Sequence, residues 1–130
     1  MINKASIDFD DTLDRLDVQE FARYLVGKGW DVYIVTCRPD KYIGKYIGQE
    51  RPNNDYVYEV AKWCGIKEEN IIFLGGGKDK IEYLSGERFI FHIDDSPDEL
   101  MRIRESDDDC YPISVDYYDW KEHLKEKFKI

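Results

Sequence analysis

Apolar and polar positions divide the chain into two kinds of segment that follow each other in turn. Five short segments are nearly continuous runs of apolar and β-branched residues, which is the pattern of strands buried on both faces. The segments between them carry apolar residues at helical spacing. The predicted strands cover residues 4–9, 31–36, 70–74, 88–93 and 111–115.

Helix ends are also marked in the sequence. The first helix is expected to be capped by Asp17, with Glu20 three residues later as in a capping box, and to end at Gly27 and Gly29. The segment "SPDE" (96–99) has the same spacing, with Pro97 at the first helical position, and predicts a later helix start. The expected core-facing helical positions are Val18, Phe21, Ala22, Leu25 and Val26; Val57, Val60, Ala61 and Cys64; Leu100 and Ile103; and Trp120, Leu124 and Phe128.

The alternation of strands and helices predicts an α/β fold. Buried strands separated by helices form a mostly parallel sheet with helices on both faces, so we expect a three-layer sandwich around five strands. A chain of 130 residues has the size of one ordinary domain. Residues 1–130 are therefore expected to form a single domain.

Composition and charge narrow the function classes. The chain has 28 acidic and 19 basic side chains and a net charge of −9, which argues against an extended nucleic-acid-binding surface. No stretch approaches the roughly 20 apolar residues of a membrane helix, and the first residues lack the pattern of a signal peptide. We therefore expect a cytoplasmic protein without a membrane partner. Three cysteines without a CxxC pair predict free thiols.

Polar side chains gather where the predicted strands end, which is where parallel α/β sheets bind their ligands. Carboxylates that follow two different strands, Asp8 and Asp94, would repel each other unless a cation lay between them. Mg²⁺ binds one or two carboxylates together with water and phosphate oxygens, so the pattern predicts a magnesium site. The polar residues expected at these strand ends are Asp8, Asp10, Thr36, Arg38, Lys78, Lys80, Asp94 and Asp95.

Four segments resemble the motifs of the haloacid dehalogenase (HAD) superfamily. "DFDDT" (8–12) fits its DxDx[TV] motif, and "YIVT" (33–36) fits its Ser/Thr at the end of the second strand. "GKDK" (77–80) is similar to its lysine motif, and "HIDDSPD" (92–98) to its final acidic motif. Order and spacing match over nearly the whole chain. The resemblance implies a Rossmannoid sheet and a Mg²⁺-dependent phosphatase.

The resemblance also implies roles for these residues. Asp8 would be the nucleophile that forms an aspartyl-phosphate, and Asp10 the general acid and then the general base. Thr36 would donate a hydrogen bond to the phosphoryl group, and a lysine would neutralise its charge. Lys80 is favoured over Lys78 because it would open the predicted helix.

The metal ligands are expected around Asp94. Asp94 and Asp95 would complete a magnesium shell with Asp8 and the backbone carbonyl of Asp10. Asp98 fits the last acid of the motif, although a carboxylate in the first turn of a helix needs no function to explain it. His92 alternates with apolar residues inside a strand and is expected in the core.

The residues after the second strand suggest the substrate. The sequence Thr-x-Arg ending at Arg38 is similar to the phosphatase domains of polynucleotide kinases and some nucleotidases, where the guanidinium helps to hold phosphate. Tyr42 and Tyr46 are candidates for stacking on a base, with the alternative that the loop pins both rings onto the core. Thr12, which ends the first motif, is a further candidate for substrate binding.

The expected elements leave no room for a cap domain, because residues 13–35 and 37–77 are used by helices, strands and a loop. The resemblance implies that a member of this superfamily without a cap acts on a large or extended substrate, or borrows a lid from a neighbouring subunit or loop. We therefore expect a nucleotide or a phosphorylated nucleic-acid end as the substrate. The sequence does not decide between a monomer and an oligomer.

Two other classes of protein share parts of this pattern. A phosphorelay receiver has similar residues, but its acid pair follows the first strand and its single aspartate the third, which is not the order found here. The other alternative is a catalytically weak protein of the same fold that binds or sequesters a nucleotide or a protein partner. All the motif residues are present, which favours the enzyme.

Overall fold

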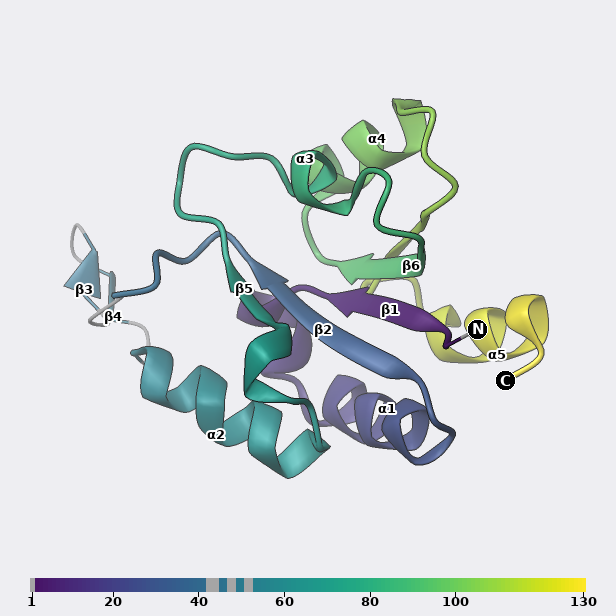
Figure 1. Cartoon of the computed structure of the whole chain (residues 1–130), viewed down its shortest axis with the longest axis horizontal. Helices are drawn as coiled ribbons and strands as arrows, with labels where there is room; N and C mark the ends of the chain where they lie inside the picture. Colours follow the sequence, from purple (N-terminus) through teal and green to yellow (C-terminus); the bar gives the residue numbers. More distant parts are fainter. Residues whose placement is uncertain (1, 42–44, 47–48, 51–52) are drawn as a thin grey trace.

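The computed structural model describes residues 2–41, 45–46, 49–50 and 53–130 (Figure 1). Five strands form one sheet in the order β5-β2-β1-β6-β7, and every neighbouring pair is parallel. This confirms the predicted α/β class and five-stranded parallel sheet. The strands are β1 (Lys4–Ile7), β2 (Asp31–Thr36), β5 (Ile71–Phe73), β6 (Phe89–Asp94) and β7 (Tyr111–Ser114).

Helices connect the strands. In Figure 1, α1 and α2 lie on one side of the sheet, and α3 and α4 lie on the other. Two short turns of helix, Phe9–Leu13 and Glu68–Asn70, and a small antiparallel pair, β3 (Lys45–Tyr46) and β4 (Gln49–Glu50), complete the described elements. The helices are α1 (Leu16–Gly27), α2 (Asn54–Cys64), α3 (Lys80–Leu84), α4 (Pro97–Glu105) and α5 (Trp120–Phe128).

Two clusters of buried apolar side chains hold the helices against the sheet. The larger one joins strand residues such as Ile7 and Phe91 to α1, α2 and α5, where the edge of Trp120 packs on Phe21 with ring centroids 5.2 Å apart. The smaller one joins β2 and β6 to α3 and α4 through Leu84 and Ile103. The predicted apolar stripes therefore face the core.

Local chemistry explains several helix ends. Gly65 ends α2 at φ 81°, a left-handed conformation that favours glycine. The Ser96 hydroxyl accepts the backbone N–H of Glu99 at 3.3 Å, and Pro97 is the first residue of α4, as predicted. Among the described residues, no helix has the length and apolarity needed to span a bilayer. Cys37, Cys64 and Cys110 are free thiols.

The start of α1 differs from the prediction. The helix begins at Leu16 and its N-cap is Arg15, so Asp17 lies inside the first turn. The Arg15 guanidinium donates to both carboxylate oxygens of Asp17, at 3.1 and 2.8 Å, and the backbone N–H of Val18 also donates to Asp17 Oδ1, at 3.0 Å. The first strand is also shorter than expected, because the chain turns at Phe9–Leu13 with Asp11 at φ 60°.

Candidate active site

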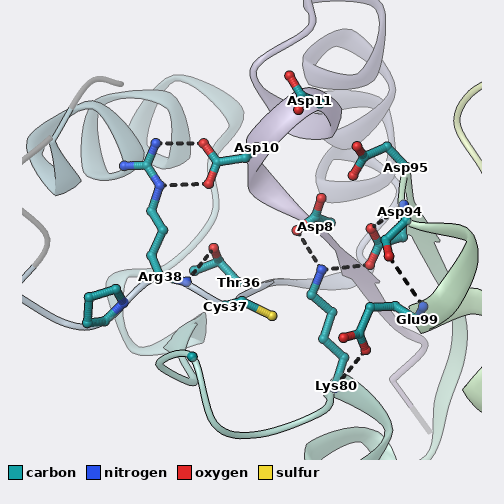
Figure 2. Close-up of a pocket in the computed structure, with 13 residues that line it drawn as sticks. Asp8, Asp10, Asp11, Thr36, Cys37, Arg38, Lys80, Asp94, Asp95 and Glu99 are labelled. Carbon is teal, nitrogen blue, oxygen red and sulfur yellow. Dashed lines mark hydrogen bonds and ion pairs between the residues drawn. The ribbon is translucent and has the colours of Figure 1, made fainter. Parts of the chain in front are cut away.

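The carboxyl ends of the strands surround a cavity of about 580 Å³ (Figure 2). Most of the predicted site residues line it, although they come from four different parts of the chain. Glu99 and Cys37 also line it and were not predicted as site residues. The predicted residues that the structure brings together here are Asp8, Asp10, Thr36, Arg38, Lys80, Asp94 and Asp95.

Lys80 links two buried carboxylates at the centre of the site. Its ammonium donates to Asp8 Oδ1 and to Asp94 Oδ2, each at 2.7 Å. Burial alone would lower the pKa of Lys80, but the two carboxylates outweigh it and raise the pKa. The backbone N–H of Lys80 donates to Glu99 Oε2 at 3.0 Å, so α4 holds the first residue of α3 in place. Lys80 is therefore a fixed, charged group.

Asp8 is held at the end of β1 in an environment that disfavours its negative charge. Burial, followed by the nearby charge of Asp94, raises the pKa of Asp8 well above its usual value, and Lys80 opposes this only in part. Thr12 donates its hydroxyl to Asp8 Oδ2 at 3.0 Å, because the tight turn after β1 brings it back over the strand end. Thr12 is thus a buried partner of Asp8 in this structure.

A buried chain of hydrogen bonds, made by side chains of β6 and β1, holds Asp94 in place. The His92 Nε2 atom lies 2.7 Å from Asp94 Oδ2, and its Nδ1 atom lies 2.8 Å from the Ser6 hydroxyl. Burial lowers the pKa of His92, although Asp94 opposes this, and so favours the neutral ring. In the tautomer that carries its proton on Nε2, the ring donates to Asp94 and its Nδ1 atom accepts from Ser6. Burial alone would raise the pKa of Asp94, but His92 and then Lys80 lower it. Asp94 is therefore an anion of fixed orientation.

Removing the His92 support should weaken both the fold and any cation site at Asp94. His92→Leu leaves the buried Ser6 hydroxyl without its partner and removes one of the hydrogen bonds to Asp94, which keeps those from Lys80 and Ser96. We expect this to cost about 1–3 kcal/mol in the free energy of unfolding. It should also lower Mg²⁺ affinity by about 10- to 100-fold, the usual effect of losing the support of a ligand. Urea unfolding and a Mg²⁺ titration without substrate measure the two effects.

His92→Gln is the matched control, because its amide N–H can replace the Nε2 donor. It should retain most of the stability and of the Mg²⁺ affinity. Equal Mg²⁺ affinity in His92→Leu and the wild type would show that the hydrogen bond does not support a cation site.

Asp10 and Arg38 form a separate ion pair at one side of the cavity (Figure 2). Arg38 Nε and Nη2 donate to the two oxygens of Asp10, at 2.8 and 2.7 Å. Thr36 lies beside them, and its hydroxyl accepts the backbone N–H of Arg38 at 3.2 Å. In this structure the Arg38 guanidinium binds Asp10, and its expected contact with substrate stays a prediction.

Three carboxylates are close enough to hold a metal ion together. One oxygen from each of Asp8, Asp94 and Asp95 lies within 4.8 Å of the others. Burial raises the pKa of Asp95; a hydrogen bond with Asp8 opposes this, and the charge of Asp94 adds to it. A set of ligands made only of carboxylate oxygens suits a hard cation. These residues therefore fit a divalent ion.

The remaining predicted residues lie elsewhere. Lys78 is exposed in the loop before α3, and Asp98 is exposed in the first turn of α4. Tyr42 lies outside the described residues, and although Tyr46 belongs to β3, its side chain is not described either. The expected stacking of Tyr42 and Tyr46 on a base stays a prediction.

No protein-family model, curated protein or solved structure matches the chain. The interpretation of the site therefore rests on its own geometry and on the motifs quoted above.

Proposed function

We propose that the chain is a Mg²⁺-dependent phosphomonoester hydrolase of the HAD superfamily, a capless three-layer sandwich that works through an aspartyl-phosphate. The observation that carries the proposal is the position of Lys80. Its ammonium lies 2.7 Å from Asp8, in the first motif, and 2.7 Å from Asp94, in the last. These two carboxylates and that of Asp95 form a cluster that suits a cation. An anion-binding ammonium next to a nucleophile and a cation site is the arrangement that phosphoryl transfer requires.

The residues divide the work over two steps. In the first, an Asp8 oxygen attacks phosphorus, the bond to the leaving oxygen breaks, and Asp10 gives that oxygen a proton. In the second, water attacks phosphorus, the bond to Asp8 breaks, and Asp10 takes the proton from the water. Lys80 and Thr36 stabilise the negative charge on the phosphoryl oxygens.

In this proposal the carboxylates of Asp8, Asp94 and Asp95 bind the metal ion, and the backbone carbonyl of Asp10 is a further ligand. A bound Mg²⁺ would neutralise charge on the phosphoryl group and on the carboxylates around it. The close approach of the three carboxylates supports this assignment, because the single positive charge of Lys80 does not balance all three of them.

We further propose a nucleotide or a phosphorylated nucleic-acid end as the substrate, in a cytoplasmic setting. The cavity of about 580 Å³ is much larger than a phosphate ion and lies within the range of roughly 300–1,000 Å³ that holds drug-sized ligands. The net charge of −9 supports a short ligand over a long polyanion.

Phosphate release from a panel of phosphomonoesters tests the proposal. The panel contains 5′- and 3′-nucleotides, 3′-phosphorylated oligonucleotides and sugar phosphates, each with Mg²⁺ and with a chelator. We expect release that depends on Mg²⁺ and is highest with nucleotides or oligonucleotide ends. Asp98→Asn is the control, since that exposed carboxylate should not affect the rate.

A different result would change the assignment. Tight binding of one panel member without any release would favour a protein that sequesters its ligand. Release that persists in the chelator would contradict the metal-dependent mechanism.

A further inference from the structure

Given the proposed function, on which this step rests, we infer that Arg38 is a positioning residue that orients the Asp10 carboxylate for proton transfer. Its guanidinium binds both Asp10 oxygens in a fork. This role differs from the expected contact between Arg38 and the substrate phosphate.

The fork limits how Asp10 can move. Asp10 lies in the tight turn after β1, and its side chain is 27% exposed. Two parallel N–H···O bonds hold a carboxylate in the plane of the guanidinium, a geometry that lysine cannot reproduce. Arg38 therefore fixes the direction of the Asp10 carboxylate, whose two oxygens point toward the guanidinium (Figure 2).

Arg38 is itself held in place. Its side chain is only 4% exposed, and the guanidinium carbon lies 5.1 Å from the centre of the Phe9 ring. On another side, Nη1 lies 3.4 Å from the Asn54 amide oxygen. The Asn54 amide nitrogen donates to the carbonyls of Pro39 and Asp40, so the start of α2 fastens the loop that carries Arg38. A side chain packed in this way is suited to hold a neighbour.

The consequence for the reaction follows from the role of Asp10. Protonation of the leaving oxygen matters most when the leaving group is a poor one, such as the alkoxide of a nucleotide. It matters little for p-nitrophenyl phosphate, whose leaving group departs without a proton. If Arg38 acts through Asp10, losing either residue should slow the alkyl ester much more than the aryl ester.

A double-mutant cycle with Asp10→Asn and Arg38→Gln tests the inference, with the best nucleotide of the panel and p-nitrophenyl phosphate as substrates. We expect Asp10→Asn to lower kcat on the nucleotide by about 10²- to 10⁴-fold. Arg38→Gln should lower it by about 10²-fold, the effect of a misplaced catalytic group. The double variant should be no slower than Asp10→Asn, because Arg38 then has no carboxylate to orient.

Two further variants separate positioning from other effects. Arg38→Lys keeps the charge but not the fork, so it should behave like Arg38→Gln. Arg15→Gln removes another arginine that binds an aspartate in a fork outside the cavity, and should leave kcat on both substrates unchanged.

Several results would overturn the inference. Losses that multiply in the double variant, equal losses on the two substrates, or wild-type kcat with a raised KM in Arg38→Gln would assign Arg38 to the substrate phosphate. These results would leave the proposed function intact. Absence of turnover in the wild type would overturn both.

Discussion

Replacing Asp8 with asparagine is expected to abolish phosphate release while the fold persists. The change removes the oxygen nucleophile at nearly constant side-chain volume, and we expect a loss of about 10⁵-fold or more, the scale on which other enzymes lose activity with their nucleophile. Stability should not fall much, since burial and Asp94 already disfavour the Asp8 charge. Phosphate release and thermal unfolding, measured on the same preparation, check both parts.

The comparison for Asp8→Asn is Asp98→Asn, which removes an exposed carboxylate from the last motif. That variant should match the wild type. If Asp8→Asn retained turnover, another residue would have to carry the phosphoryl group, and the proposed mechanism would be wrong.

Replacing Lys80 with methionine should give the largest effect on stability. Without the ammonium, two buried carboxylates face each other, and removing one partner of a buried ion pair costs about 3–5 kcal/mol. Without metal, we expect the low end of this range, a loss of about 3 kcal/mol in the free energy of unfolding. The reason is that Asp8, whose pKa is raised, can relieve the repulsion by taking up a proton. Turnover should fall by about 10²- to 10³-fold, as when a preorganised donor is lost.

Magnesium makes this result specific to the site. A divalent cation would supply the charge that Lys80→Met lacks, so Mg²⁺ should raise the unfolding temperature of the variant more than that of the wild type. Lys78→Met removes an exposed lysine two residues earlier and should change stability by no more than about 0.5 kcal/mol. Equal stability of Lys80→Met and the wild type without metal would contradict the buried ion pairs.

The sequence predicts the fold well because its strongest signals are local. β2 covers the predicted residues 31–36, since a buried strand in the middle of a sheet is a continuous apolar run. Gly65 and Ser96 mark helix ends through conformations and hydrogen bonds made within a few residues. Asp17 lies inside the first turn of α1 and not at its cap, and its carboxylate binds Arg15 and the backbone N–H of Val18. A helix-capping pattern does not show those contacts.

The sequence predicts which side chains meet in the cavity for those residues that lie at strand ends, because parallel strands bring those ends together. His92 was expected only in the core, although a residue two positions before Asp94 points to the same side of the strand, and that spacing is the available signal. The support of Lys80 by Glu99 and of Asp10 by Arg38 joins residues distant in sequence. Such contacts depend on how α4 and the turn after β1 pack, and spacing alone does not reveal them.

The central claim is that a phosphoryl group passes through Asp8, and trapping it is the most direct test. The protein is mixed with the phosphomonoester that it hydrolyses best and with Mg²⁺, quenched in acid within milliseconds and digested for mass spectrometry. We expect a phosphoryl group on the peptide that contains Asp8, absent from Asp8→Asn and from samples with chelator. An enzyme that turns over rapidly without phosphorylating this peptide, or that carries the group on another residue, would contradict the account.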